Sequence, residues 1–498
     1  MKEVLSVKNM RESDAATIAG GVPGRELMYR AGVGICESVS WREPVAIVCG
    51  CGNNGGDGYV LATLLRARGV SCTLFALSEK LSEDGRYYAD LCAVQGIPCV
   101  TCGADVDFSG YLTVVDCIFG TGFRGEVKDP ERSVIEAINR ARETGAYVVS
   151  VDINSGMNGQ NGRCVTAVRS DLTVSIGSYK PGHFLGAAKD YIGSLVNSDI
   201  GIQPIETPYG LIEGSDVRAA LGVRKNDSNK STYGYIALIG GSECYSGAIR
   251  LASLAESAMR SGAGVTTVAA PRSLSQVILP AILESTFFPL SEENGAIKFD
   301  AEEMERLTRR VKVVAFGMGV GLSRETERAV EFLLSHFKGT LLLDADGLNA
   351  LSRLPRALLR EREGTVILTP HPLEFARLSG LSVDEVLEDP IRHAQDYARD
   401  TGAVVLLKGT ATVVTDGARV ILIDRGCAGM ATAGSGDVLS GILAALLGYV
   451  SDYVTAAASA AYLNGRAGEL AERENGAISM TAGDTARQVK NAVRELFE

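Results

Sequence analysis

Short apolar runs alternate with amphipathic stretches over the first half of the chain. Five of these runs are predicted to be buried strands: Pro44–Cys49, Cys72–Ala76, Leu112–Asp116, Tyr147–Asp152 and Leu172–Ile176. Stretches with helical spacing, such as Tyr59–Arg68 and Arg132–Glu143, lie between them. Because strands that are apolar along their whole length need cover on both faces, the alternation predicts a parallel sheet with helices on each side.

A second series of the same kind follows a polar interval. The interval covers Gly201–Ser231 and is rich in Pro, Gly and polar residues. Six further strands are predicted after it: Tyr235–Ile239, Val265–Ala269, Val311–Phe316, Thr340–Leu343, Val366–Thr369 and Val404–Leu407. Two helices rich in small residues, Val438–Tyr449 and Tyr453–Arg473, complete the series.

The length of 498 residues is too great for one ordinary hydrophobic core. We therefore predict an α/β protein with two doubly wound parallel-sheet domains. The boundary is expected near Leu211, which places residues 1–211 in the first domain and 212–498 in the second. Ligands in such folds bind at the carboxyl ends of the strands.

The composition narrows the classes of function. A net charge of −11 argues against a nucleic-acid partner, which would need basic patches. The N-terminal twenty residues carry several charges and do not resemble a secretory segment, so the eleven scattered cysteines are expected to be free thiols of a cytoplasmic protein. The longest apolar stretch, Val438–Val450, is too short to span a bilayer, so no membrane association is expected. We also expect a homo-oligomer.

The segment most suggestive of chemistry is Met430-Ala-Thr-Ala-Gly-Ser-Gly-Asp437. Its small residues allow a tight bend, and the predicted helix that follows presents unpaired N–H groups and its positive dipole end at the same point. Such a corner binds phosphate. A carboxylate beside it, that of Asp437, suits the activation of a hydroxyl that attacks a phosphoryl group. Taken alone, the segment also fits a helix cap after a glycine turn.

A second glycine-rich segment, Gly50-Cys-Gly-Asn-Asn-Gly-Gly-Asp-Gly58, follows the first predicted strand as a loop before a helix. Its spacing does not match a dinucleotide fingerprint. Amide and carboxylate oxygens without His or Cys suit a hard cation or a polyhydroxyl ligand. Asp116, Asp152 and Ser155 could converge on the same place. The alternative is a tight strand–helix turn with Asx capping.

Four segments of the first half together resemble the NAD(P)H-hydrate epimerase domain, a Rossmann-like α/β sandwich. They are Asn53–Gly58, Gly120–Glu126, Val151–Gly156 and Lys180–Phe184. The resemblance implies that the hydrated dinucleotide contacts Asn53, Asn54, Gly55, Gly56, Asp57, Gly120, Thr121, Gly122, Phe123, Arg124, Gly125, Glu126 and Asp152. It also implies that Asn54, Asp116 and Ser155 ligate K⁺ and that Lys180 and Asp152 act as a catalytic pair in proton handling. Without the family, Lys180 fits a solvated loop lysine equally well.

The second half resembles a ribokinase-like fold, and specifically the ADP-dependent NAD(P)H-hydrate dehydratase. The matching segments are Gly240–Ser242, Tyr245–Ala248, Arg260–Gly264, Gly317–Gly319, Asp344–Asn349, Thr369–Glu374, Lys408–Thr410 and Gly429–Asp437. Both sets of segments follow the order found in the bifunctional NAD(P)H-hydrate repair enzymes. One departure is Cys427-Ala428, where the family usually has Asn-Pro, and it concerns the rigidity of the loop rather than its chemistry.

The resemblance also assigns roles in the second half. It implies that ADP, together with Mg²⁺, binds to Lys408, Gly409, Thr410, Ala411, Thr412, Gly429, Met430, Ala431, Thr432, Ala433, Gly434, Ser435 and Gly436. The hydrate is expected at Ala248, Gly319, His371, Pro372, Leu373, Glu374 and Asp437, with Asp437 as the catalytic base. Ala248 and Gly319 would leave room for the nicotinamide ring, and Glu374 would help to hold Mg²⁺ or water.

Four residues of the second half also have a purely structural interpretation. A histidine between prolines, such as His371, is more often structural than catalytic. A lysine at a strand end, such as Lys408, is often a surface residue with a buried stem. Asp344 and Asp346 fit strand-end caps and turn residues.

The predicted function is the repair of hydrated NADH and NADPH. By resemblance, the first domain interconverts the R and S hydrates, and the second dehydrates the S hydrate with ADP, giving AMP and phosphate. One rival is an ATP-dependent small-molecule kinase, such as a hydroxymethylpyrimidine or thiazole kinase, in which the phosphoryl group stays on the product. Another is a non-catalytic binding protein whose first domain recognises a lipoprotein or nucleotide partner.

Overall fold

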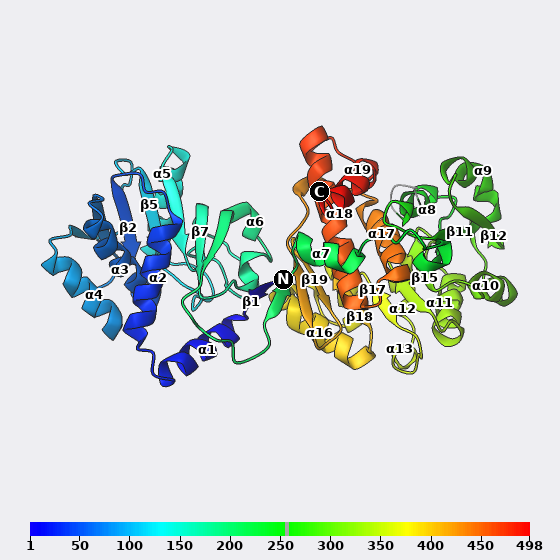
Figure 1. Ribbon diagram of the computed structural model, residues 1–498, viewed down its shortest axis with the longest axis horizontal. Helices are drawn as coiled ribbons and strands as arrows, with labels where there is room; N and C mark the ends of the chain where they lie inside the picture. Colours follow the sequence, from blue (N-terminus) through cyan, green and yellow to red (C-terminus); the bar gives the residue numbers. More distant parts are fainter. Residues whose placement is uncertain (254–257) are drawn as a thin grey trace. The chain divides into compact units, whose positions relative to one another are not determined.

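The computed structural model describes residues 1–253 and 258–498, and the chain divides into two compact units (Figure 1). One unit is Glu3–Tyr209, and the other combines Gly210–Glu498 with Met1 and Lys2. The first two residues belong to this second unit because the N-terminal ammonium pairs with Asp216 at 2.8 Å and Lys2 pairs with Glu213 at 3.2 Å.

The unit Glu3–Tyr209 is built on seven parallel strands in the order β4-β3-β2-β5-β6-β7-β8. These strands are β2 (Val45–Cys49), β3 (Cys72–Ala76), β4 (Cys99–Thr101), β5 (Thr113–Cys117), β6 (Tyr147–Val151), β7 (Ser170–Ile176) and β8 (Ile192–Ser198). The helices are α1 (Val7–Ala19), α2 (Gly24–Ser38), α3 (Asn53–Ala67), α4 (Glu83–Val94), α5 (Glu131–Glu143) and α6 (Ala188–Tyr191), with a 3₁₀ turn at Pro181–His183. The strand order reverses between β2 and β5, and open α/β sheets bind ligands at such a reversal.

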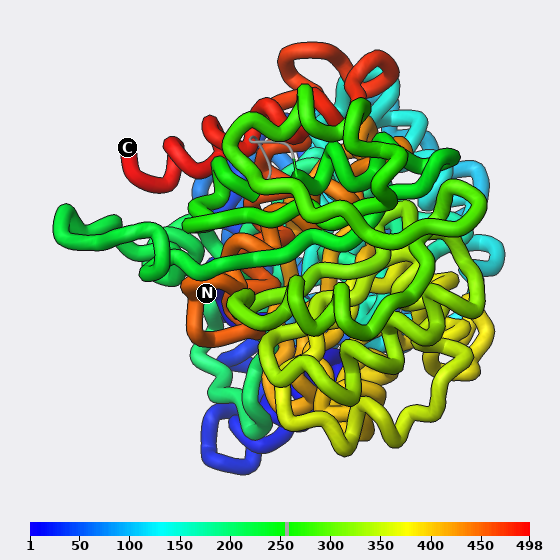
Figure 2. Tube along the Cα trace, turned by 90° about the vertical axis from the view of Figure 1, so that its right-hand side faces the viewer, coloured from blue at the N-terminus to red at the C-terminus, as the bar shows by residue number. Residues whose placement is uncertain are grey.

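The second unit contains an eleven-stranded sheet in the order β1-β9-β20-β19-β18-β17-β16-β15-β10-β11-β12. Its strands are β1 (Lys2–Val4), β9 (Tyr209–Leu211), β10 (Tyr235–Gly240), β11 (Val265–Pro271), β12 (Thr286–Leu290), β15 (Val313–Met318), β16 (Thr340–Leu343), β17 (Val366–Leu368), β18 (Val404–Leu407), β19 (Thr412–Thr415) and β20 (Val420–Ile423). A separate hairpin joins β13 (Glu292–Glu293) to β14 (Ala296–Ile297). Figure 2 turns the chain so that the segment from β11 to β12, drawn in green, lies on the side that faces the viewer.

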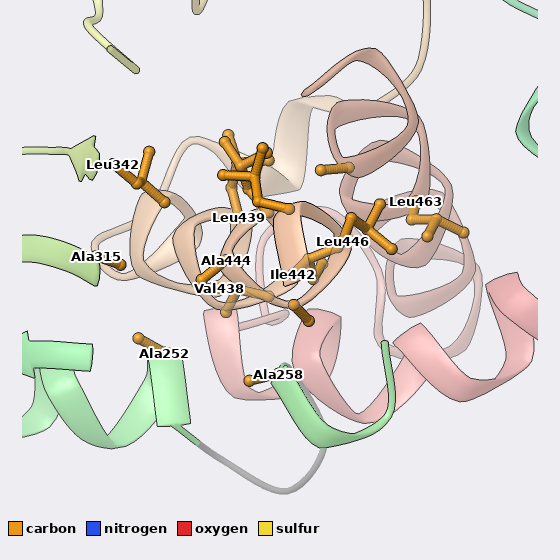
Figure 3. Packing of buried hydrophobic residues seen from close by; sticks show 14 of the residues in the cluster. Ala252, Ala258, Ala315, Leu342, Val438, Leu439, Ile442, Ala444, Leu446 and Leu463 are labelled. Atoms are coloured by element: carbon orange, nitrogen blue, oxygen red, sulfur yellow. The ribbon is translucent and has the colours of Figure 1, made fainter. Parts of the chain in front are cut away.

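Helices of the second unit flank this sheet and form its core. They are α7 (Gly214–Leu221), α8 (Ser246–Ser253), α9 (Ser275–Ile278), α10 (Ala301–Thr308), α11 (Arg324–His336), α12 (Asp346–Leu351), α13 (Ala357–Arg360), α14 (Pro372–Ser379), α15 (Val383–Glu388), α16 (Pro390–Thr401), α17 (Ser435–Tyr449), α18 (Tyr453–Asn475) and α19 (Ala482–Glu495). Short 3₁₀ turns lie at Lys230–Tyr233, Arg272–Leu274, Leu279–Ala281 and Ala428–Met430. In α17 every residue from Val438 to Gly448 is buried, because the helix packs among α8, α18 and the sheet (Figure 3).

The pattern of apolar runs is confirmed by the strands. All eleven predicted strands are present, each within two residues of the predicted ends. The α/β fold class is confirmed, but the second sheet is mixed and not parallel throughout, because β19 runs antiparallel to both β18 and β20. The chain between these strands is too short for a parallel crossover, which needs a dozen residues or more. Strands such as β4, whose three residues are all exposed, carry no apolar run and were not predicted.

All eleven cysteines are free. Cys99 and Cys102 lie three residues apart in nearly extended chain, where their Cα atoms are separated by about 10 Å, beyond the reach of a disulfide. Among the described helices, none combines the length and the apolar character needed to cross a membrane.

Candidate active sites

A cavity of about 920 Å³ opens at the point where the first unit's strand order reverses. Ten of the residues that line it come from the start of α3 and from the segment after β5, and most of the others come from α1, α2 and later strand ends. Of the predicted site residues, those that line it are Asn53, Asn54, Asp57, Gly120, Thr121, Gly122, Phe123, Arg124, Asp152 and Lys180. Asp14 and the apolar side chains of Met10, Ile200 and Ile202 also line the cavity, and no sequence motif predicted them.

The segment Asn53–Gly58 forms the first turns of α3, so its prediction as a loop is wrong. Glycine is needed there because the helix start is pressed against the sheet. A Cβ on Gly55 would lie 2.1 Å from the carbonyl oxygen of Gly50, and one on Gly56 would lie 2.5 Å from Met28 Cε. Gly55 and Gly56 therefore set the position of α3, which turns Asn54 and Asp57 toward the cavity.

Asp152 and Lys180 form an ion pair in this cavity. The Lys180 side chain is 1% exposed, and its ammonium also donates to the Ile176 carbonyl oxygen at 2.7 Å. The solvated-loop interpretation of Lys180 is therefore wrong. Asp152 has a φ of +63°, an unfavourable conformation for a residue with a side chain, and such strain gathers at functional sites.

His183, two residues beyond Pro181, fixes this arrangement. Its Nδ1 accepts a hydrogen bond from the Lys180 amide at 3.0 Å, so Nε2 carries the proton and donates to the Asp152 carbonyl oxygen at 2.7 Å. Burial lowers the pKa of His183 to about 4, so the ring is neutral at physiological pH. The sequence placed His183 inside a matching segment, yet it gave no role to the residue.

Asp57 and Asp152, two of the carboxyl groups that line the cavity, differ in acidity. Burial works to raise the pKa of Asp152, but the Lys180 ammonium and the Thr121 amide outweigh it, and the pKa lies below the usual range. Burial, followed by the charge of Asp152, holds the pKa of Asp57 well above its usual range. A neutral acid and an ionised base in one cavity are the two groups that proton transfer needs.

Asn54 and Ser155 bind the backbone of Phe119, and Asp116 binds that of Ile118 next to it. The Asn54 amide donates to the Phe119 carbonyl oxygen at 3.0 Å, and the Ser155 hydroxyl accepts from the Phe119 amide at 2.8 Å. Asp116 is fully buried and accepts hydrogen bonds from Ser150, Ser155 and the Ile118 amide. The Asn54 Oδ1 is buried with no hydrogen-bond partner, which suits an oxygen ligand of a large cation.

The segment Gly120–Glu126 contributes one end to the cavity. Gly120 lies beside Asp152, since a Cβ there would be 3.2 Å from Asp152 Oδ2. The Phe123 ring stacks on Phe119 at 4.8 Å between centroids. Gly125 and Glu126 are exposed and are not among the residues that line the cavity.

In the second unit, Asp437 lies in the first turn of α17. This helix begins directly after Gly434, which is its N-cap residue and has a φ of +96°. Within the described chain, the amide groups of Gly436 and Asp437 donate to no protein acceptor, so they remain available to an anion. Burial is the largest cause that raises the pKa of Asp437 to about 7, and the charge of Asp344 adds to it. Asp437 is therefore suited to accept a proton at neutral pH.

Lys408, Glu374 and His371 lie close to Asp437's helix at the ends of neighbouring strands. The Lys408 ammonium is 3.1 Å from Asp344 Oδ1 and 3.9 Å from Glu374 Oε2. His371 caps α14, with Nδ1 accepting from the Leu373 amide at 3.2 Å, and Glu374 Oε2 accepts from the His371 amide at 2.8 Å. The structural interpretation of His371 thus has a concrete basis, while about half of its side chain stays exposed to a ligand.

Ala248 and Gly319 are neighbours, because a Cβ on Gly319 would lie 2.9 Å from the Ala248 Cβ and 2.8 Å from the Tyr245 Cβ. The close approach of α8 therefore requires Gly319, whether or not a ring binds beside it. Pro372 begins α14, and Leu373 is exposed next to it.

The loop before α17 is held by α18. Glu469 accepts a hydrogen bond from the Gly426 amide, and Glu472 accepts one from the Gly429 amide at 2.8 Å. These contacts hold the loop that contains Cys427-Ala428. In this loop Gly429 is buried, whereas Ala431, Thr432 and Ala433 are exposed. In the other segment predicted to bind the nucleotide, Gly409 and Thr410 are exposed and Ala411 is buried. Thr412 begins β19.

Two family models match the chain. The model described as NAD(P)H-hydrate dehydratase matches residues 236–491, and the model described as YjeF-related protein N-terminus matches residues 24–182. The bifunctional NAD(P)H-hydrate repair enzyme Nnr of Moorella thermoacetica is 36% identical over 505 residues, covering 96% of this chain and 94% of that enzyme. The enzyme of the same name from Pyrobaculum aerophilum is 35% identical over 490 residues, covering 95% of each chain.

A solved structure matches the second unit's half of the chain. It is the ADP/ATP-dependent NAD(P)H-hydrate dehydratase from Bacillus subtilis, co-crystallised with ATP and Mg²⁺. The TM-score is 0.50 and the sequence identity is 29%, with 58% of this chain and 99% of that chain covered.

Proposed function

The chain belongs to the bifunctional NAD(P)H-hydrate repair enzymes, and from this premise we propose that each compact unit carries one of the two activities. The family repairs hydrated NADH and NADPH through an epimerase and an ADP/ATP-dependent dehydratase. We assign epimerisation to the cavity of the unit Glu3–Tyr209 and dehydration to the site around Asp437. The observation that supports this division best is that each unit holds its own buried Asp–Lys pair at the ends of its strands.

Epimerisation inverts the carbon of the hydrate that carries the hydroxyl group. In the proposed mechanism, the neutral carboxyl of Asp57 protonates the leaving hydroxyl, and the ring nitrogen's electron pair stabilises the cation that results. Asp152, ionised beside Lys180, takes a proton from the water that adds to the other face. The reverse reaction uses the two groups in exchanged roles.

Dehydration of the S hydrate needs a better leaving group than hydroxide. Asp437 removes the proton from the ring hydroxyl, whose oxygen then attacks the terminal phosphoryl group of ADP, and AMP leaves. The amides of Gly436 and Asp437 and the Lys408 ammonium stabilise the charge on the transferred group. Phosphate then leaves with the electron pair of its bond to the ring carbon, and the neighbouring ring carbon loses a proton to solvent, which restores the ring double bond. Mg²⁺ bound with the nucleotide would neutralise phosphate charge, and Glu374 is the carboxylate we propose to help hold it.

The proposal is tested by incubating the protein with NADH hydrate and ADP and following absorbance at the reduced-nicotinamide band. Recovery of that band, with AMP and phosphate released, supports repair. A stable phosphorylated product would instead indicate the kinase alternative, and no reaction would indicate the binding alternative. A homo-oligomeric state stays a prediction, to be measured by light scattering.

The two activities are expected to be separable, because each unit has its own sheet and its own core. A chain that ends at Tyr209 should retain epimerisation. A chain that begins at Gly210 should retain dehydration of the S hydrate, with lower stability because it lacks the ion pairs of Met1 and Lys2. If both folded parts were inactive, a site that needs both units would be the better explanation.

Potassium is expected to support epimerisation, because Asn54 Oδ1 lacks a partner beside Ser155 and Asp116. After dialysis into tetramethylammonium chloride, the epimerase rate should fall at least severalfold and recover on addition of KCl, while dehydration should not change. Asp116→Ala would be a poor test of the ion site, since it would leave the Ile118 amide, the Ser150 hydroxyl and the Ser155 amide without an acceptor. Equal epimerase rates in the two salts would contradict the ion site.

A further inference from the structure

Four segments of the second unit meet at one buried carboxylate, that of Asp344. The residue follows β16 and is 2% exposed. Its Oδ1 accepts hydrogen bonds from Thr369 Oγ1 at 2.8 Å and from Lys408 Nζ at 3.1 Å. Its Oδ2 accepts one from Ser440 Oγ at 2.8 Å. Thr369 follows β17, Lys408 follows β18, and Ser440 lies in α17 three residues after Asp437, so a single side chain joins the strand ends to the helix of the site.

The backbone around Asp344 is specialised to aim this side chain inward. Ala345 has a φ of +46°, a conformation that is unfavourable for a residue with a side chain. The turn is held because the Asp344 amide donates to the Phe316 carbonyl oxygen and the Gly347 amide donates to that of Asp344. A Cβ on Gly317 would lie 1.9 Å from the Asp344 carbonyl oxygen, so the neighbouring strand end must be glycine. A simple cap at the end of a strand would need none of these features.

We propose that Asp344 is a positioning residue for dehydration, which fixes the Lys408 ammonium and the first turn of α17 in one mutual arrangement. The proposal rests on the function proposed above for Lys408 and Asp437. A lysine has a flexible four-carbon stem, and an ammonium without a partner samples many positions. A salt bridge at 3.1 Å holds the charge where the transferred phosphoryl group would meet it, and the Ser440 bond holds the helix that presents Asp437.

The Asp344 charge also acts on Asp437. The charged groups that face Asp437 are Asp344 after β16, Asp346 in α12 and Lys408 after β18. Both carboxylates raise the pKa of Asp437 and Lys408 lowers it, after burial, which is the largest cause. Removing the Asp344 charge should therefore lower the pKa of Asp437. Since Asp437 acts as a base, the acid limb of the dehydratase pH profile should then move to lower pH.

The test uses the full chain with Asp344→Asn, Lys408→Gln and the double variant. We expect Asp344→Asn to lower kcat/KM for ADP by about ten- to a hundredfold and to shift the acid limb of kcat to lower pH. Epimerisation measured on the same preparation should not change, which reports that the protein is intact. Because Asp344 acts through Lys408, kcat/KM for ADP in the double variant should be little lower than in the less active of the two single variants.

Asp346→Asn provides the matched control. This carboxylate lies two residues away and accepts from the Gly321 amide, and no contact with Lys408 is described for it. Its variant should keep near wild-type kcat with a smaller shift of the acid limb. Should Asp344→Asn fail to fold, Ser440→Ala removes one of the three bonds without removing the charge, and it should lower kcat severalfold.

Wild-type kcat and an unmoved acid limb in Asp344→Asn would overturn the proposal. Additive losses in the double variant would also overturn it, because Asp344 would then act independently of Lys408. An unchanged kcat in Ser440→Ala would remove the role assigned to the helix contact. A wrong assignment of the base to Asp437 would be recognised separately, because dehydration would then persist in Asp437→Asn.

Discussion

Replacing Asp437 with asparagine is expected to abolish dehydration while ADP binding and epimerisation persist. The amide keeps the size of the carboxyl group and leaves the helix amides of α17 free to hold phosphate. It removes the basic oxygen, and loss of a general base typically costs a hundredfold or more. Single-turnover dehydration and ADP titration on the same preparation would measure the two effects separately.

The same substitution is expected to stabilise the second unit above neutral pH. Burial raises the pKa of Asp437 from an ordinary value of 3.8 to about 7. Between these values the unfolded chain is ionised while the folded chain keeps its proton, so the wild type loses stability as pH rises through this window. The loss is complete above pH 7 and amounts to roughly 1–3 kcal/mol after allowance for partial solvent access.

Thermal unfolding at pH 5 and pH 8 would measure this effect. Asp437→Asn should unfold at a higher temperature than the wild type at pH 8, and the difference should shrink at pH 5. Asp346→Asn serves as a comparison, because burial also raises the pKa of the Asp346 carboxyl, which lies in α12 and not in α17. Dehydration at near wild-type rate in Asp437→Asn would show that another group is the base.

Much of the fold could be predicted because buried parallel strands are written as continuous apolar runs. Val45–Cys49 and Val404–Leu407 have no exposed position, and both were located from their side chains alone. The apolar runs of β19 and β20 were not among the predicted strands, and their antiparallel direction depends on the length of their connections, which hydrophobicity does not encode. The helical start of α3 escaped because Asn and Gly disfavour helix locally, and tertiary packing of Gly55 on Gly50 overrides that preference.

The two sites could likewise be predicted only in part from the sequence. The rule that ligands bind at the carboxyl ends of strands brought Asp116, Asp152 and Ser155 to one place, and their contacts with each other or with neighbouring backbone place them there. The rule does not say which side chain a buried carboxylate will meet. The partners of Asp344 come from three other segments, so its interpretation as a cap could change only once their packing was known. The contrast between Asp57 and Asp152 likewise depends on burial and on the position of Lys180.

Lys180→Met is expected to abolish epimerisation and to destabilise the first unit. The methionine keeps most of the buried stem but leaves the Asp152 carboxylate without its cation in a site where the lysine is 1% exposed. Breaking a buried pair by removing one partner costs about 3–5 kcal/mol. The pKa of Asp152 should rise, because the Lys180 charge is the main cause that opposes burial, and the base would be protonated at neutral pH. Epimerisation should fall a hundredfold or more.

The double variant Asp152→Asn with Lys180→Met separates the two effects. It removes both charges, so most of the lost stability should return, whereas epimerisation should stay lost because neither group of the pair remains. Chromatographic separation of the R and S hydrates would measure epimerisation, and thermal unfolding would measure stability, with dehydration as the internal control. If Lys180→Met kept the wild-type rate, the pair would serve only to hold Asp152 in its strained conformation. Proton transfer would then have to come from Asp57 and water.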